Sequence, residues 1–297
     1  MRKRRNTSFW LYAIGTYILI QFFWWAWLLI SQNTEEDLSR RILMVAGEGA
    51  VFLLLLFLGF RKLRKSIELE VNLAHTQQNF LLSVTHELNT PLATIKLYLQ
   101  TILKRDLEKT QIDEILQNSI SETDRLKGLV DNILTSARID ENELKLHVSK
   151  QNLGDIVQKL LSPKTAHEGY NRIKTQIKND VYCQVDPLAI ASILQNLLDN
   201  AIKYDPSEKE IVVVVDFVND CAILEVRDQG LGVSANQKNE IFQKFYRIQS
   251  EKTRSTKGTG LGLFIVRNLV ELQNGEIEHL DNSPIGSIFN IKFPPIA

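Results

Sequence analysis

A histidine directly precedes a carboxylate in the segment 80–92, which reads Phe-Leu-Leu-Ser-Val-Thr-His-Glu-Leu-Asn-Thr-Pro-Leu. Apolar residues recur here every three or four positions, which predicts a helix with one buried stripe. The stripe consists of Leu81, Val84, Leu88, Leu92, Ile95, Leu99 and Ile102. At 100° per residue, His86 lies roughly 160° from the centre of this stripe, on the solvent side. A purely structural histidine would be expected on the stripe, so an exposed His86 beside Glu87, which can take or hold a ring proton, indicates a nucleophile.

Pro91 follows this histidine within two turns of the predicted helix. Proline lacks a backbone N–H, and its ring clashes with the carbonyl four residues back, here that of Glu87. We therefore expect the helix to bend one turn after His86. The bend and the exposed imidazole favour a site that a second domain must reach.

Two amides and a cation share one face of another predicted helix, at 187–203. Asn196, Asn200 and Lys203 are spaced by four and three residues. Amide oxygens suit a hard cation such as Mg²⁺, and a lysine suits phosphate. Further along, Asp228 comes straight after a predicted strand, where its carboxylate can accept a hydrogen bond from an exocyclic amine.

Two groups of glycines follow. Gly230 and Gly232 come just after the aspartate and allow the backbone to approach a ligand closely. Gly258, Gly260 and Gly262 open a predicted helix, and such a turn presents free backbone N–H groups to anionic oxygens. One glycine pattern alone is more often a plain turn, but the order and spacing of the whole set indicate a nucleotide pocket. The Walker pattern Gly-x-x-x-x-Gly-Lys is absent.

These motifs resemble two parts of one protein family. The segment 86–92 is similar to the phosphoacceptor box of bacterial sensor histidine kinases, usually His-Glu-Leu-Arg-Thr-Pro-Leu, and departs from it only at Asn89. The region 141–294 resembles the ATP-binding domain of the histidine kinase, gyrase and Hsp90 superfamily. The resemblance implies a transmembrane sensor histidine kinase of a two-component system.

The resemblance implies an ATP pocket made of Asn196, Asn200, Lys203, Tyr204, Asp228, Gly230, Gly232, Gly258, Gly260 and Gly262. Asn196 would hold Mg²⁺, while Asn200 and Lys203 would contact the phosphates. Tyr204 would cover the base, and Asp228 would bind the adenine amine. The first two glycines would shape the base pocket, and the last three would close a lid over the phosphates.

A mechanism follows from the resemblance together with the exposed histidine. The ATP domain would bring the γ-phosphate to a neutral His86, and Glu87 would take the released proton. The phosphoryl group would then pass to an aspartate of a separate response regulator. Thr90, one turn after His86, is expected to orient a water on that aspartyl phosphate, so the protein would also dephosphorylate its regulator. Whether phosphorylation runs in cis or in trans stays open.

Two apolar runs, 8–30 and 42–60, are long enough to span a bilayer and are joined by an 11-residue loop. They predict a transmembrane hairpin, because a signal peptide would have a shorter apolar region and a small-residue cleavage site. Basic residues at 2–5 and 61–65 put both termini in the cytoplasm, in the inner (cytoplasmic) membrane. Glu48 interrupts the second run; it either snorkels or pairs with Arg41 or Gln21, or it is functional.

The remaining elements are expected as follows. The region 61–91 has no internal Pro or Gly and predicts one continuous connecting helix. A second amphipathic helix is expected at 111–139, and two such helices leave their apolar faces half covered, so a homodimer would close a four-helix bundle. Strands are expected at 144–148, 181–185, 211–217, 222–227 and 287–293, and helices at 153–161, 187–203, 236–242 and 261–272.

The chain is therefore expected to be multidomain. A two-span membrane hairpin at 1–60 and a connecting helix at 61–79 precede a dimerisation and histidine phosphotransfer domain at 80–140, and an α/β sandwich that binds ATP follows at 141–297. The 35 basic and 35 acidic residues cancel and indicate no nucleic-acid partner. Cys183 and Cys221 match no metal spacing and are expected to be structural thiols.

Two other classes of function compete with the kinase. A membrane-tethered nucleotide-binding scaffold that no longer transfers phosphate would be expected to carry a broken His, Asn or Gly motif, and none is broken. A gyrase- or Hsp90-like ATPase would be expected to lack the exposed His-Glu box.

Overall fold

The structure is a computed structural model, and it describes residues 15–25, 27, 38–162, 170–205, 208–248 and 258–295. For residues 38–42, 44, 45, 72 and 73 it describes the backbone only. The chain divides into two compact units, Met1–Ala74 and His75–Ala297, which are described separately.

The first unit contains a helix at 15–25 and the beginning of α2 (Leu38–Lys104). Among the described residues, none of the helices combines the length and the apolarity needed to cross a membrane. The predicted run 8–30 includes positions 8–14, 26 and 28–30, which lie outside the described residues. The two membrane spans therefore stay a prediction.

The carboxylate of Glu48 has two partners within this unit. Gln21 Nε2 donates to Glu48 Oε2 at 3.4 Å, and Trp25 Nε1 donates to the same oxygen at 3.0 Å. The predicted partner Gln21 is confirmed, and Trp25 is an addition. The alternative partner, the Arg41 side chain, lies outside the described side chains.

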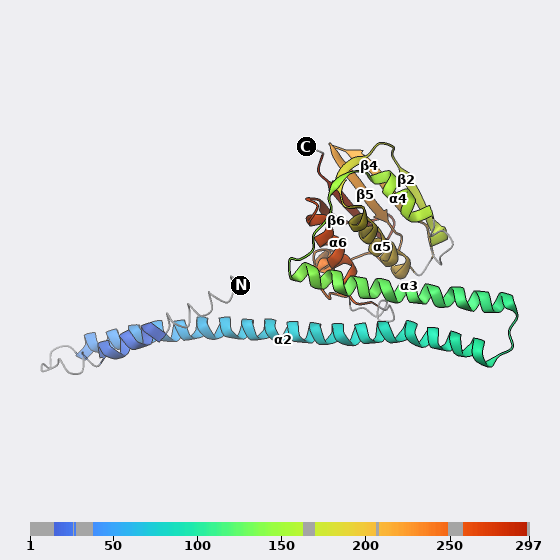
Figure 1. Ribbon diagram of the computed structural model, residues 1–297. Helices are drawn as coiled ribbons and strands as arrows, with labels where there is room; N and C mark the ends of the chain where they lie inside the picture. Colours follow the sequence, from blue (N-terminus) through green and yellow to red (C-terminus); the bar gives the residue numbers. More distant parts are fainter. Residues whose placement is uncertain are drawn as a thin grey trace. The chain divides into compact units, whose positions relative to one another are not determined.

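The second unit begins with a helical hairpin (Figure 1). α2 continues without a break through Pro91 and ends at Lys104, so the continuous helix predicted over 61–91 is confirmed. α3 (Lys109–Asp140) returns after a short loop and starts with a capping box, in which Glu108 and Gln111 bond each other's backbone N–H. Leu81, Leu92 and Leu99 of the apolar stripe are exposed. α3 therefore covers only part of the stripe, which is the half-covered state predicted for two helices.

A five-stranded mixed sheet, in the order β2-β4-β5-β7-β6, forms one layer of the C-terminal domain. Its strands are β2 (Ile173–Ile177), β4 (Ile211–Val218), β5 (Cys221–Arg227), β7 (Ser287–Phe293) and β6 (Glu276–Asp281). β2 pairs with β4 in parallel, and the other neighbours are antiparallel. One apolar row crosses all five strands and consists of Ile177, Val215, Leu224, Ile291 and Ile277. Side chains alternate across a strand, so this row fixes the register.

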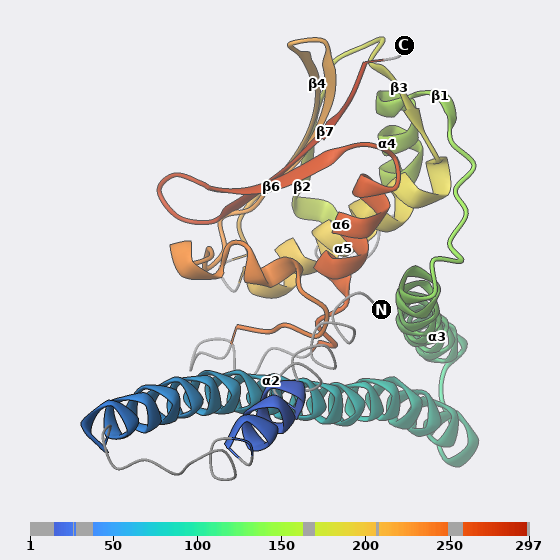
Figure 2. The same cartoon turned by 90° about the vertical axis from the view of Figure 1, so that its left-hand side faces the viewer.

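Three helices form the second layer on one face of this sheet (Figure 2). They are α4 (Leu153–Leu161), α5 (Pro187–Tyr204) and α6 (Gly262–Glu271). A separate ribbon pairs β1 (Ser149–Asn152) with β3 (Tyr182–Val185). The core lies between the layers, where Leu197, Ile265 and Val266 are fully buried. The predicted α/β sandwich is confirmed.

Several predicted elements differ from the structure. The strand predicted at 144–148 is wrong: the segment has no regular structure, and its Leu144 and Leu146 pack on the core while β1 starts at Ser149. The helix predicted at 236–242 is wrong as well, because two 3₁₀ turns, Ala235–Gln237 and Glu240–Phe242, replace it. β2 and β6 were not predicted, since Lys-Thr-Gln and Glu-Ile-Glu-His interrupt their apolar patterns.

Candidate functional site

His86 is exposed on α2, as the sequence predicts. The neighbouring Glu87 side chain is only 11% exposed, and its Oε2 lies 3.7 Å from Nη2 of Arg125 on α3. The hydroxyl of Thr90 donates to the backbone carbonyl of His86 at 3.0 Å. The histidine, the carboxylate and the threonine therefore share one stretch of helix, and the threonine hydroxyl is bonded to the backbone there.

The predicted amide face lies on α5, whose start is fixed by Asp186. Oδ1 of this residue accepts from the N–H groups of Leu188 and Ala189, and Pro187 occupies the first turn. Oδ2 of Asp186 accepts from the N–H of His147, which ties the segment before β1 to the same helix end. The position of the helix is thus set by buried contacts outside the nucleotide face.

Asn196, Asn200 and Lys203 lie on one face of α5 as predicted, and Asn196 is buried. Asn196 Nδ2 donates to the Ser192 carbonyl at 2.9 Å. Its Oδ1 accepts from Asn132 Nδ2 at 3.3 Å, and Asn132 Oδ1 accepts in return at 3.4 Å. In this arrangement the amide of the ATP domain is bonded to helix α3.

Lys203 lies in a site that disfavours its own charge. Burial lowers the pKa of Lys203 to about 8, with a further lowering by Arg247 and Arg125 and an opposite effect from Glu87 and Asp199. An anion that binds beside such a lysine favours its protonated form, because a nearby opposite charge raises the pKa of the amine. The charges of Arg247, Arg125 and Glu87 thus all act on Lys203.

Tyr204 follows on the same helix and is half-buried. Burial raises the pKa of its hydroxyl, and the Lys203 Nζ lies 4.9 Å from its ring centroid. Gly230 packs against this residue so closely that a Cβ there would lie 2.6 Å from the Tyr204 carbonyl oxygen. The glycine is therefore required for the loop after β5 to reach the end of α5.

Asp228 lies at the end of β5 and is buried. Its Oδ1 accepts from the N–H groups of Gly230 at 2.9 Å and Ser287 at 3.1 Å. Burial raises the pKa of this carboxyl, and the two backbone bonds oppose the rise. With both bonds on one oxygen, the other oxygen is left to accept from a ligand.

The remaining glycines line the same region. Gly260 has φ +72°, and a Cβ there would lie 2.8 Å from the Phe245 backbone. A Cβ on Gly262 would lie 2.9 Å from Asn196 Oδ1, and one on Gly258 would overlap the Lys203 ammonium. The glycine turn thus lies against the amide face, and its predicted role as a lid over the phosphates stays a prediction. Gly232 (φ +70°) approaches the backbone of Gly286, just before β7.

The ATP domain also contacts the hairpin near His86. The rings of Phe80 and Phe245 lie 4.1 Å apart, and Arg247 Nη1 donates to Ser83 Oγ at 3.4 Å. Lys244 forms an ion pair with Asp140 at the end of α3. Ser83 lies one helical turn before His86. Arg247 of the C-terminal domain therefore reaches the turn of α2 that leads to His86.

Sequence reasoning missed two of these residues. Arg125 and Asn132 lie on the polar side of α3, and nothing in the sequence separates them from other polar residues there. Phe245 and Arg247 belong to an aromatic segment that stands out in composition, but their partners on α2 could be found only in three dimensions.

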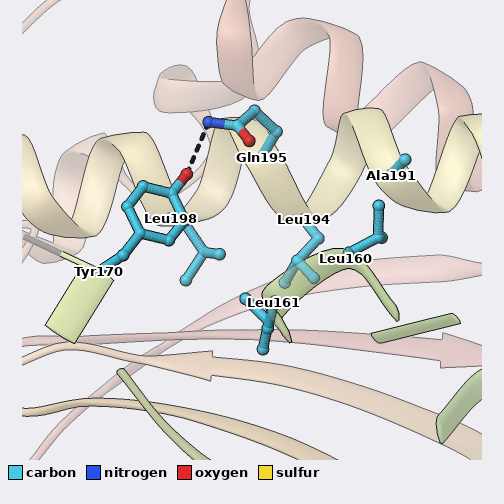
Figure 3. A pocket seen from close by; sticks show the side chains of 7 residues that line it. All are labelled: Leu160, Leu161, Tyr170, Ala191, Leu194, Gln195 and Leu198. Atoms are coloured by element: carbon cyan, nitrogen blue, oxygen red, sulfur yellow. Dashed lines mark hydrogen bonds between the residues drawn. The ribbon is translucent and has the colours of Figure 1, made fainter. Parts of the chain in front are cut away.

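A small hollow opens on a different face of α5 (Figure 3). Its lining residues are Leu160, Leu161, Tyr170, Ala191, Leu194, Gln195 and Leu198. Of these, Ala191, Leu194, Gln195 and Leu198 are on α5 and lie roughly 150° around the helix from the amide face at 100° per residue. The Gln195 amide donates to the Tyr170 hydroxyl at 2.7 Å. The described residues that line this hollow are mostly leucines and include no lysine or arginine, so they do not suit phosphates.

Two family profiles match the chain. Residues 76–142 match the family described as His Kinase A (phospho-acceptor) domain. Residues 185–297 match the family described as histidine kinase-, DNA gyrase B-, and HSP90-like ATPase. The first match contains His86 and the second contains the amide face and both glycine groups.

Two relatives are sensor proteins. The sensor protein SrrB of Staphylococcus aureus is 30% identical over 229 residues, which cover 76% of this chain and 39% of the relative. The sensor protein KdpD of Clostridium acetobutylicum is 28% identical over 236 residues, covering 78% of this chain and 26% of the relative. The chain thus spans well under half the length of these curated relatives.

The fold is also similar to a solved structure, the Acinetobacter baumannii histidine kinase AdeS. The TM-score is 0.50 at 24% identity, over 71% of this chain and 98% of the other. The chain therefore contains a phospho-acceptor domain of the His Kinase A family, followed by a domain of the histidine kinase-, DNA gyrase B-, and HSP90-like ATPase family, and it is similar to sensor proteins over both.

Proposed function

We propose that this chain transfers the γ-phosphoryl group of ATP to His86 and then to an aspartate of a separate response regulator. The observation that carries the proposal is the contact of Arg247 with Ser83, one turn before an exposed His86. It brings Arg247 of the ATP domain to the turn that leads to the nucleophile. A histidine without such a neighbour would not support the proposal.

The transfer needs little covalent chemistry from the protein. An unprotonated ring nitrogen of His86 attacks the γ-phosphorus, and the bond to the oxygen that bridges the β- and γ-phosphates breaks as the P–N bond forms. ADP leaves with the electron pair, and the proton on the other ring nitrogen passes to Glu87. Catalysis then consists mainly of positioning and charge stabilisation.

Each predicted pocket residue has a role that its surroundings support. Asp228 accepts from the adenine amine, and Tyr204 covers the base, with Gly230 and Gly232 shaping that side of the pocket. Asn200 and Lys203 bind the phosphates. Gly258, Gly260 and Gly262 present backbone N–H groups at the start of α6, where the helix dipole favours an anion.

Asn196 suits Mg²⁺ because its Oδ1 is an amide oxygen that faces the glycine turn, next to Gly262. When bound, the ion neutralises charge on the phosphates. Within the described part of the chain no group of three or more His, Cys, Asp or Glu residues could hold a metal ion. Asn196 would hold the ion through its amide oxygen, and the ion would supply positive charge to the phosphates.

Dephosphorylation of the regulator by the same hairpin is part of the proposal. Thr90 lies one turn from His86 and orients the attacking water after it releases the His86 carbonyl. The hydrogen bond to that carbonyl, at 3.0 Å, shows that the hydroxyl lies on the histidine's own side of the helix.

We propose that the working protein is a homodimer. The exposed apolar side chains of the hairpin support this, because a solvated stripe of this length is unfavourable. They include Leu81, Leu92, Leu97, Leu99 and Leu103 of α2, and Leu116, Ile120, Val130 and Leu134 of α3. A second copy covers them by completing a four-helix bundle.

We also propose that 8–30 and 42–60 form a hairpin in the cytoplasmic membrane, with both termini in the cytoplasm. The supporting features are the two apolar runs and their flanking basic residues. The contact of Glu48 with Gln21 and Trp25 supports an antiparallel pairing of the runs. Extraction of the full chain from membranes by detergent, but not by alkaline carbonate, tests this.

Labelling of the full chain with ATP radioactive at the γ-phosphate tests the proposed reaction. We expect label that is stable in base and labile in acid, as a phosphoramidate is. His86→Gln should abolish it and leave ATP binding intact, because the side chain is exposed. Label that survives this substitution would refute the assignment of His86. ADP release without any label would instead favour an ATPase of the gyrase and Hsp90 type.

A further inference from the structure

No lysine or arginine lies within eight residues of Glu87 on its own helix. The segment 80–92 contains no lysine or arginine, and the first cation after it is Lys96. The Glu87 side chain is nevertheless 11% exposed, so water solvates it only in part. A carboxylate in such a position needs a partner from another element.

That partner is Arg125 on α3. Its Nη2 lies 3.7 Å from Glu87 Oε2, and its Nη1 lies 3.6 Å from Oε2 of Glu122, one turn earlier on α3. The planar guanidinium is thus held at one end by its own helix and reaches across the hairpin with the other. The Arg125 side chain is 53% exposed.

Stability alone does not account for this pair. Ion pairs with a half-exposed partner contribute little to folding, because water screens them and the long side chains lose entropy. The location matters more, since Glu87 is the proposed acceptor of the proton from His86. A guanidinium that fixes its carboxylate also fixes the distance between that carboxylate and the ring.

The charges around Arg125 point to the same step. Both Arg125 and Arg247 lower the pKa of Lys203, while Glu87 raises it, so the charges of these three groups all act on Lys203. Arg247, which follows η4 (Glu240–Phe242), also donates to Ser83 Oγ at 3.4 Å, one turn of α2 before His86. An incoming phosphoryl group, which is anionic, would meet a net positive field at this point.

We propose that Arg125 is a positioning residue of the phosphoryl transfer, acting through Glu87. It holds the carboxylate against the His86 ring so that the ring proton has an oriented acceptor when the P–N bond forms. The inference rests on the proposed phosphorylation of His86. It adds Arg125 of α3 to a phosphoacceptor site whose sequence-predicted residues all lie on α2.

The test is the rate of His86 labelling in the full chain over a range of ATP concentrations. Arg125→Gln should lower the maximal rate roughly 10-fold or more, since positioned proton transfer contributes about 100-fold or more. The KM for ATP should change less than the maximal rate does, because the printed partners of Arg125 are Glu87 and Glu122 rather than residues of the proposed nucleotide pocket. Arg125→Lys keeps the charge without the planar guanidinium. Its maximal rate should therefore lie between those of the unaltered chain and of Arg125→Gln.

A double-substitution cycle separates this role from a structural one. If Arg125 acts through Glu87, then Arg125→Gln should cost little in a Glu87→Gln chain, so the two losses do not multiply. Arg138→Gln is the matched control, an arginine on the same helix about 20 Å further along at 1.5 Å per residue. It should label at the unaltered rate.

Three results would overturn the inference while leaving the proposed function intact. The first is an unchanged rate for Arg125→Gln. The second is a loss of rate that multiplies with the loss caused by Glu87→Gln. The third is an equal loss of rate in Arg125→Lys, together with a loss of helicity measured by circular dichroism. Absence of label on the unaltered chain, with ATP bound, would overturn the proposed function and this inference with it.

Discussion

The amide pair between Asn132 and Asn196 should compete with the nucleotide. Asn196 Oδ1 is the atom proposed to bind Mg²⁺, and here it accepts from Asn132 Nδ2. Nucleotide binding therefore requires this contact to open. When only the open state binds, the apparent affinity is the intrinsic affinity multiplied by the fraction of the protein that is open.

The size of the effect follows from the geometry. The two hydrogen bonds are 3.3 and 3.4 Å long, at the weak end of the normal range, and neither joins a charged group. Each should contribute about 0.5 kcal/mol net, so the pair stabilises the closed arrangement by about 1 kcal/mol. Asn132→Ala should therefore raise the affinity for Mg²⁺ and a non-hydrolysable ATP analogue by up to about 5-fold.

Calorimetric titration of the full chain with that analogue measures the change. Asn118→Ala is the matched control, because Asn118 is an exposed asparagine on the same helix, about 21 Å earlier at 1.5 Å per residue. It should leave the affinity unaltered. Asn132→Leu, which keeps the size of the side chain, should behave as Asn132→Ala does. An affinity that stays the same, or falls, in folded Asn132 variants would show that the pair does not block the site.

Four further predictions concern single residues. Asn200→Ala should lower labelling at least about 10-fold with the dimer intact by light scattering; normal turnover would contradict its phosphate role. ATP affinity should fall as the pH rises through about 8, because the neutral Lys203 amine no longer attracts phosphate, and Lys203→Arg should flatten this dependence in fluorescence titrations. Thr90→Ala should keep labelling but slow the loss of phosphate from the regulator, and an equal fall in both would show that the hydroxyl serves only the helix. Glu48→Gln and Glu48→Leu, in bilayers, should change the ratio of kinase to phosphatase activity in a graded way; two variants identical to the unaltered chain across stimuli and pH would show that Glu48 is merely tolerated.

Helices and strands with a regular apolar period could be read from the sequence. α4 lies at 153–161 and β7 at 287–293, as predicted, because each buries one periodic face. The edge strands could not be read: β2 pairs with only one neighbour and carries the polar run Lys-Thr-Gln. The apolar period also gave a wrong prediction at 236–242. This segment looks like an α-helix in sequence but forms two short 3₁₀ turns.

The sequence by itself determined which residues could do chemistry. The off-stripe position of His86 and the four-and-three spacing of Asn196, Asn200 and Lys203 follow from the helical repeat, which is a local property of the chain. The tertiary structure decided what surrounds them. Arg125 is 38 residues from Glu87, and Asn132 is 64 residues from Asn196, so neither pair shares a helix or leaves a periodic signal. Only the folding of α3 beside α2 and of the ATP domain beside α3 brings these side chains within reach of each other.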